Sequence, residues 1–191
     1  MEEDLTLTGA LFLRHRRLLL AGVVPLLFLC AFLCRHDGRL LESCVLTLCL
    51  WAAAVFDFHY GLIFDRLTFS MAVLAACFHL HGLSDLPAFL LGAFAGGAPL
   101  FFLSVLTNGG LGGGDVKLAA AGGLWLGWKG ALLALAFASW IGGIAAIILL
   151  LLGRRQRHDT MAFGPFLSVG IFVSFWFGER ILAWYEAFCL G

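Results

Sequence analysis

Apolar residues occur along this chain in long runs that are separated by short polar stretches. Most runs have roughly the 20 residues that an α-helix needs to cross a bilayer. Seven such segments are predicted, the fifth of them short: Leu18 to Leu33, Leu40 to Phe58, Leu67 to His81, Leu86 to Leu106, Val116 to Trp128, Gly130 to Leu152 and Ala162 to Trp184. The pattern predicts an all-α, polytopic bundle of about seven (six to eight) transmembrane helices. We expect residues 1–191 to form a single membrane-embedded domain.

Composition supports a membrane protein. Of the 191 residues, 62% are hydrophobic and only 13% are charged, which is far from the usual balance of a soluble domain. The formal net charge is zero, so no overall field attracts nucleic acid. We therefore expect the lipid bilayer as a partner and no nucleic acid.

Basic residues are distributed unevenly between the polar stretches, and this bias predicts orientation. With the N-terminus in the cytoplasm, seven spans put most of them on the cytoplasmic side: Arg14, Arg16, Arg17, Arg66, Lys117, Arg154, Arg155 and Arg157. The same topology puts the 57–66 turn and the 107–115 loop on the cytoplasmic side. Asp57 and Asp115 are therefore able to meet.

Two of the twelve acidic residues stand out by their position. Asp57 ends an apolar helical run, and Asp115 opens another in which Lys117 is the only charge. An ionisable group at membrane depth costs about 2.5 to 3.5 kcal/mol or more, so each is a functional candidate. The alternatives are an interfacial aspartate at position 57 and a helix N-cap at position 115.

The glycine run before Asp115 admits several interpretations. A phosphate-binding loop is excluded because Val116, not a glycine, directly precedes Lys117, and a dinucleotide loop is excluded because Asp115 takes the place of its third glycine. A flexible linker remains an alternative. At membrane depth, however, irregular backbone survives only beside protein or a water-filled cavity. Gly112 and Gly114 are thus predicted to open a narrow site in which extended substrate lies beside a carboxylate.

The six cysteines give no sign of a metal centre. None forms a C-x-x-C pair of the kind that holds zinc, and most lie in or beside apolar runs. They are interpreted as small packing residues. We expect neither a metal nor a cofactor.

Three segments together resemble one known family. GGGDVKL at 112–118 resembles the G-x-G-D motif of the type IV prepilin peptidases, the bacterial leader peptidases of pilin-like proteins, with a lysine two residues after the aspartate. DFHYGLIFDRLT at 57–68 resembles their other element, an aspartate followed eight residues later by an acidic or amide residue. FGPF at 163–166 resembles a third. The three in this order are much more specific than G-x-G-D alone.

The chain departs from the family pattern at two points. Phe64 stands where a proline commonly precedes the second acidic position. Larger members carry a cytoplasmic region with paired C-x-x-C motifs, associated with N-methylation of the product, and this sequence contains neither. The resemblance therefore implies cleavage without methylation, as in minimal members and the related archaeal preflagellin peptidases.

The resemblance implies an aspartic endopeptidase with Asp57 and Asp115 as its catalytic residues. Two carboxyl groups a few ångströms apart cannot both ionise freely, so they share a proton, one activating water while the other donates to the scissile carbonyl. Base and acid are not assigned. Gly112, Gly114 and Lys117 are predicted to line the loop along which substrate approaches.

Other polar residues are interpreted as structural. Eight residues of helix would put Asp65 about 12 Å from Asp57, and an N-cap or a local ion pair with Arg66 accounts for Asp65. His59 is interpreted as an interfacial histidine. The Gly92-x-x-x-Gly96 and Gly123-x-x-x-Gly127 patterns predict close helix contacts.

The family implies a substrate and a location. The substrate is a prepilin-like or pseudopilin-like protein whose short basic leader is cut on the cytoplasmic side of the bacterial inner membrane, before an apolar helix. Two alternatives remain: a presenilin-like intramembrane protease, and a non-enzymatic proton- or cation-coupled transporter. The particular substrate and the oligomeric state stay open.

Overall fold

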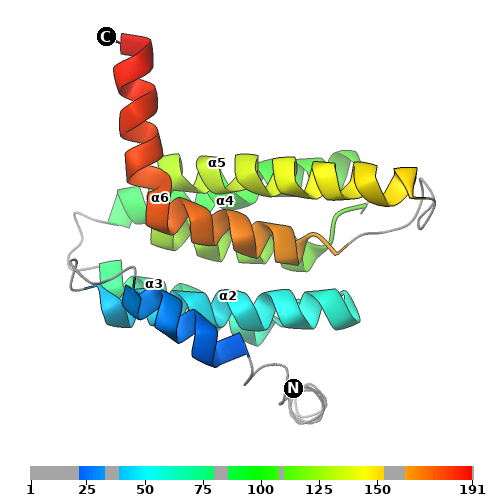
Figure 1. The fold of residues 1–191 in the computed structure, drawn as a ribbon, viewed down its shortest axis with the longest axis horizontal. Coiled ribbons are helices and arrows are strands. Elements are labelled where there is room, and N and C mark those ends of the chain that lie inside the picture. The colour runs from blue at the N-terminus through cyan, green and yellow to red at the C-terminus, as the bar shows by residue number, and fades with distance from the viewer. Residues whose placement is uncertain (1–21, 33–38, 80–85, 108–109, 153–161, 191) are drawn as a thin grey trace.

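The computed structural model describes residues 22–32, 39–79, 86–107, 110–152 and 162–190, and within these ranges the regular structure is entirely helical (Figure 1). A helix Gly22–Phe32 precedes five labelled elements: α2 Leu40–Tyr60, α3 Asp65–His79, α4 Leu86–Leu106, α5 Gly113–Leu151 and α6 Gly164–Leu190. The predicted all-α class is confirmed. The start of the first predicted span lies outside the described residues.

Four of these helices are long and apolar enough to cross a membrane: Leu40–Tyr60, Leu86–Leu106, Gly113–Leu151 and Gly164–Phe188. The helix Gly22–Phe32 and α3 are shorter. Each of the seven predicted segments falls on helix over nearly all of its described residues, and the exceptions are the end residues Leu152, Ala162 and Phe163. The count of about seven spans and the cytoplasmic N-terminus stay predictions.

The long element α5 is interrupted at Gly127. Its backbone there has φ 67° and ψ 176°, a conformation that is essentially restricted to glycine. The break separates two helices, Gly113 to Leu126 and Trp128 to Leu151, and it lies two residues before the predicted division between the fifth and sixth segments. Figure 1 shows the two halves as separate rods lying along α6.

Contacts with α6 show that the two halves of α5 run in opposite directions. In the second half, Gly142 faces Phe166 near the start of α6, whereas the carbonyl oxygen of Gly130 accepts a hydrogen bond of 2.7 Å from Ser174, further along it. This half is antiparallel to α6. The first half begins near the start of α6, and Gly122 faces Ile171. The turn at Gly127 thus returns the chain through the bundle.

Glycines bring α4 against the first half of α5. A Cβ at Gly92 would collide with the carbonyl oxygen of Gly123, and a Cβ at Gly96 would collide with that of Ala119. Small residues let two helix backbones approach in this way, which is a common basis of helix packing in membranes. The close contacts predicted from the two G-x-x-x-G patterns are confirmed.

The main core joins all five labelled helices, and Leu100 is the contribution of α4. Its fully buried side chains come from α2, α3, α5 and α6, and the largest are Leu46, Met71, Leu118, Leu167 and Ile171. A buried hydrogen bond of 3.0 Å from the Trp125 indole to the carbonyl oxygen of Met71 adds a directional contact between α5 and α3. This core holds the end of α2 beside the starts of α5 and α6, where the candidate site lies.

Candidate active site

Asp57 lies in the last turn of α2 and is only 5% exposed. The helix ends at Gly61, whose φ of 62° is the left-handed conformation that terminates many helices and whose N–H donates to the carbonyl oxygen of Asp57 at 2.8 Å. The Asp57 carboxylate accepts a hydrogen bond of 2.8 Å from the backbone N–H of Gly164 at the start of α6. A segment 107 residues away in the chain therefore orients this side chain.

The chain between Asp57 and Asp65 is not continuous helix. It leaves helical geometry at Gly61, and Asp65 begins the separate helix α3. The expected distance of about 12 Å assumed one continuous helix from Asp57 to Asp65. That assumption is wrong, because α2 ends at the Gly61 C-cap and the chain turns there. Asp65 has an exposed side chain, in contrast with Asp57.

Asp115 is the third residue of α5 and is 7% exposed. The N-cap of this helix is Gly112, with φ −64° and ψ 137°, so the alternative of Asp115 as the N-cap is wrong. Its Oδ1 atom is buried without a hydrogen-bond partner among the described residues. Burying an unpartnered carboxyl oxygen is costly, and such atoms commonly mark a functional site.

Asp57 and Asp115 lie close enough for their charges to interact directly. They come from the end of α2 and the start of α5, which the topology brings to one end of the bundle. The structure thus places the two aspartates near one another at this end of the bundle, while their catalytic role and the side of the membrane they face stay predictions. Because like charges repel at short range, a proton shared between the two carboxyl groups removes the repulsion.

The glycines of the 112–114 segment have different surroundings. A Cβ at Gly114 would lie 2.9 Å from the Cβ of Ile63, so only glycine allows α5 to begin so close to the turn after α2. A Cβ at Gly112 would lie 3.3 Å from Oδ2 of Asp115, whereas one at Gly113 would meet nothing within 4 Å. Gly112 and Gly114 are thus tightly packed whereas Gly113 is open, and the described part of the run is more than a linker.

Lys117 forms an ion pair with Asp65 rather than with either buried aspartate. The Lys117 Nζ and Asp65 Oδ1 atoms are 2.6 Å apart, and the two side chains are 53% and 73% exposed. The expected ion pair of Asp65 is therefore made with α5, across 52 residues of chain, instead of with the adjacent Arg66. The part of Lys117 in substrate approach stays a prediction.

The contact between Gly164 and Asp57 was not predicted from the sequence. The FGPF segment was singled out only by resemblance, and it lies at the start of α6, which begins at Gly164. A Cβ at Gly164 would lie 2.6 Å from Oδ2 of Asp57, so the N–H reaches the carboxylate because no side chain intervenes. A glycine directly before a proline at a helix start was the available signal.

The ring of His59 contacts the backbone of its own helix. Its side chain is exposed, and Nδ1 lies 2.9 Å from the carbonyl oxygen of Val55, one turn back in the same helix. Across the described ranges, no three His, Cys, Asp or Glu residues gather as metal ligands.

Comparison with known proteins identifies relatives over most of the chain. The prepilin leader peptidase/N-methyltransferase of Bacillus subtilis (strain 168) is 36% identical over 139 residues, 72% of this chain and 56% of the relative. The protein of the same description from Escherichia coli (strain K12) is 38% identical over 137 residues, 69% of this chain and 59% of the relative. That of Aeromonas hydrophila is 33% identical over 151 residues, 76% and 52% of the two chains.

The chain spans just over half the length of these relatives. No solved structure matches it. A family model described as the type IV leader peptidase family matches residues 44–147, which include Asp57 and Asp115 but not the FGPF segment. With several apolar helices, these matches indicate a multi-pass membrane protein. The chain belongs to the type IV leader peptidase family.

Proposed function

We propose that the chain is a membrane aspartic endopeptidase that removes the short basic leader of prepilin-like proteins at the cytoplasmic face of the bacterial inner membrane. One observation carries the proposal: two buried aspartates from separate helices, Asp57 and Asp115, interact at one end of an apolar bundle in a chain of this family. The relatives described as prepilin leader peptidase/N-methyltransferase support the same substrate class.

The chemistry is hydrolysis of a peptide bond by a pair of carboxyl groups. The ionised aspartate takes a proton from water, and the oxygen of that water bonds to the scissile carbonyl carbon while the protonated aspartate donates to the carbonyl oxygen. Breakdown of the tetrahedral intermediate breaks the C–N bond and gives a proton to the leaving amine. The Gly164 N–H supports this scheme because it fixes the Asp57 carboxylate in one orientation.

The Gly112 to Gly114 segment is proposed as the approach for the leader. Gly112 and Gly113 are exposed beside the buried Asp115, so an extended peptide backbone is able to lie close to the carboxylates. Lys117 lies one residue beyond Val116 with its ammonium group at the surface. We propose that this exposed ammonium group, paired with Asp65, lies at the mouth of the approach.

Two finer properties belong to the same proposal. The chain cleaves without methylating the product, because none of its six cysteines forms the C-x-x-C pair associated with methylation in larger members. Its aspartates face the cytoplasm, because the basic residues favour the orientation with that end of the bundle inside. No metal or cofactor takes part.

The decisive experiment is co-expression of the chain with a prepilin-like protein. We expect the wild type to shorten the substrate by its leader, measured by mass spectrometry of the new N-terminus. Asp57→Asn and Asp115→Asn each slow the shortening by at least about a hundredfold, since asparagine keeps the shape of the side chain and removes its titratable proton. Normal processing by either variant contradicts the two-aspartate mechanism.

The same assay separates the two rival functions. A new N-terminus within the apolar helix of the substrate indicates a presenilin-like protease. An uncut substrate, together with proton flux into vesicles containing the chain, indicates a transporter. Cleavage directly before the apolar helix supports the leader peptidase, and a product with a free amino terminus supports the absence of methylation.

A further inference from the structure

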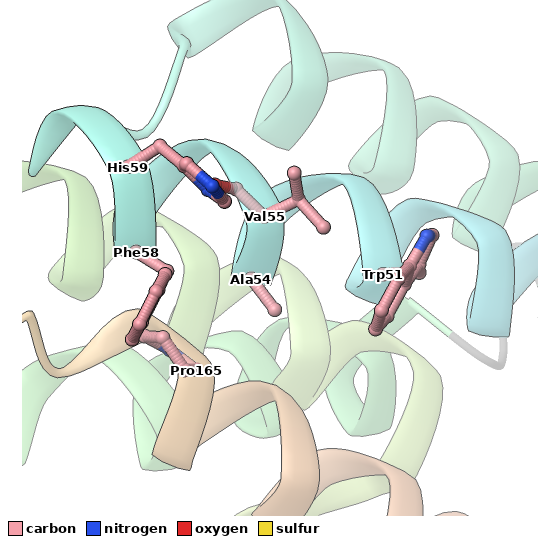
Figure 2. A pocket seen from close by; sticks show the side chains of 6 residues that line it. All are labelled: Trp51, Ala54, Val55, Phe58, His59 and Pro165. Carbon is pink, nitrogen blue, oxygen red and sulfur yellow. The ribbon is translucent and has the colours of Figure 1, made fainter. Parts of the chain in front are cut away.

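An apolar groove runs between α2 and α6 and ends beside Asp57. One part of about 250 Å³ is shown in Figure 2, with Phe58 and Pro165 at its end. A second part of about 340 Å³ continues from it, and Trp51, Ala54 and Pro165 line both parts. The second part is also lined by Leu26 and Leu29 of the helix Gly22–Phe32.

The residues that line the groove recur with helical periodicity on both α2 and α6. On α2 they recur at intervals of three and four: Thr47, Leu50, Trp51, Ala54, Val55, Phe58 and His59. On α6 they follow the same rule: Pro165, Ser168, Val169 and Phe172. Such spacing keeps each set on one face of its helix. Two facing stripes of this kind form the groove into which a third helix packs.

The floor of the groove suits a helix more than disordered lipid. The side chains of Ala54 and Ser168 are small, and small residues at this depth let a neighbouring backbone approach closely. The Oγ of Ser168, a residue only 4% exposed, lies in this lining without a hydrogen-bond partner among the described residues. A polar atom left unpartnered is costly in an apolar setting, and a helix backbone or side chain offers it an acceptor.

The groove is continuous with the candidate active site. Pro165 lines both of its parts, and the preceding residue, Gly164, donates its N–H to the Asp57 carboxylate. Phe58 lines the end of the groove and directly follows Asp57 in the chain. A helix lying in the groove therefore ends next to Asp57, and the residues that continue from it are delivered to the carboxylates.

We propose that the α2/α6 groove binds the apolar transmembrane helix of the substrate, so that the peptide bond just before this helix meets the aspartate pair. This inference rests on the proposed function and adds the surface that holds the substrate. From Thr47 to Phe58 the α2 stripe spans about 16 Å, so the groove holds roughly the first 11 residues of the bound helix. The remainder of that helix lies in the bilayer.

Site-specific cross-linking tests the groove without depending on cleavage. A photoreactive amino acid is placed at Ala54 or Val169 in the Asp57→Asn background, with a matched position at Ala136, an exposed residue of α5 outside the groove. The probe is a substrate made of a basic leader, a glycine and an apolar helix of about 20 residues. We expect cross-links to the helix of the probe from positions 54 and 169 and not from position 136.

Cross-links to lipid alone, or equal cross-linking from position 136, contradict the proposal that the groove binds the substrate helix. So does attachment of positions 54 and 169 only to this chain's own N-terminal residues, since they would then occupy it. None of these results bears on the aspartate chemistry. Normal leader removal by the Asp57→Asn parent, in contrast, overturns the proposed function and leaves the cross-link pattern interpretable.

A kinetic comparison provides a second test. Ala54→Trp fills the floor of the groove, and Ala136→Trp adds the same ring at an exposed position. We expect Ala54→Trp to raise KM for the helix-bearing probe about tenfold more than for a soluble peptide with the same leader and cleavage site. Ala136→Trp changes neither. Equal losses on both probes, or no loss on either, overturn the groove, and retained cleavage of the soluble peptide shows that the variant folds.

Discussion

Two acidic side chains on either side of one turn, Asp57 and Asp65, have opposite surroundings. Asp57 is buried, is held by the Gly164 N–H and lies beside a second buried carboxylate. Asp65 is mostly exposed and neutralised by Lys117 at 2.6 Å. Water screens the Asp65–Lys117 ion pair, so it contributes little to stability. The buried pair of Asp57 and Asp115 destabilises the fold, because neither carboxylate has a cation beside it among the described residues. The difference teaches that burial without a neutralising partner, more than the presence of a carboxylate, marks the candidate site.

Asparagine substitutions should separate the two carboxylates most clearly. Asp57→Asn and Asp115→Asn should each lower leader removal by about a hundredfold to ten-thousandfold, the usual worth of a positioned acid or base. Asp65→Asn should lower it by far less. Initial rates on a purified helix-bearing substrate give the measurement. If Asp65→Asn lowers the rate as much as Asp57→Asn does, burial does not distinguish the catalytic carboxylate from the exposed one.

The Gly164 contact should have the next largest effect. Gly164→Ala brings a methyl group to 2.6 Å from the Asp57 Oδ2 and displaces the carboxylate. A misplacement of this order costs up to about a hundredfold in rate. The matched control is Gly143→Ala in α5, where an added Cβ meets nothing within 4 Å. If the two variants cleave equally fast, the Gly164 N–H does not position Asp57.

Adjacent glycines of the loop should differ in stability. Gly114→Ala forces its Cβ against Ile63 and should destabilise the protein by about 1 to 3 kcal/mol, the usual cost of overpacking. Gly113→Ala meets open space and should be neutral or slightly stabilising, because alanine loses less backbone entropy in a helix. Thermal unfolding in detergent measures both. Equal midpoints would show that the Ile63 contact is not tight.

The exposed ion pair should give the smallest effect. Lys117→Gln and Asp65→Asn remove charges that water screens, so each should change the free energy of unfolding by at most about 1 kcal/mol. A double-mutant cycle on chemical denaturation measures their coupling, which should shrink as salt is added. A coupling of several kcal/mol would place this pair with the buried carboxylates instead.

Much of the fold could be predicted because its signals are local. Apolar runs of membrane length mark where helices lie, and glycines spaced by four, such as Gly92 and Gly96, mark where two helices approach. The pairing of Asp57 with Asp115 needed one further step, the counting of spans that puts both on one side. A loop between membrane spans lies on one of only two faces, so the sequence was enough to predict that the two aspartates share a face.

Contacts that depend on lateral packing could not be predicted in this way. The hydrogen bond from Gly164 to Asp57 joins residues 107 apart, and the ion pair of Lys117 with Asp65 joins residues 52 apart. Charge placement predicts a face of the bilayer for each of these residues but not which helices are neighbours on it. Asp65 was therefore paired with Arg66, its neighbour in the chain, and the part of Gly164 was missed.

By itself, the sequence determined that this protein is a helical membrane protein of the leader peptidase type with two aspartates as its candidate chemistry. Hydropathy and motif spacing are properties of the chain, and they act before any two helices meet. Only the tertiary structure decided that Gly164 holds Asp57, that Lys117 is engaged by Asp65, and that a groove between α2 and α6 leads to the carboxylates. These features depend on which helix faces lie against one another, and side-chain packing selects those faces only when all the helices are together.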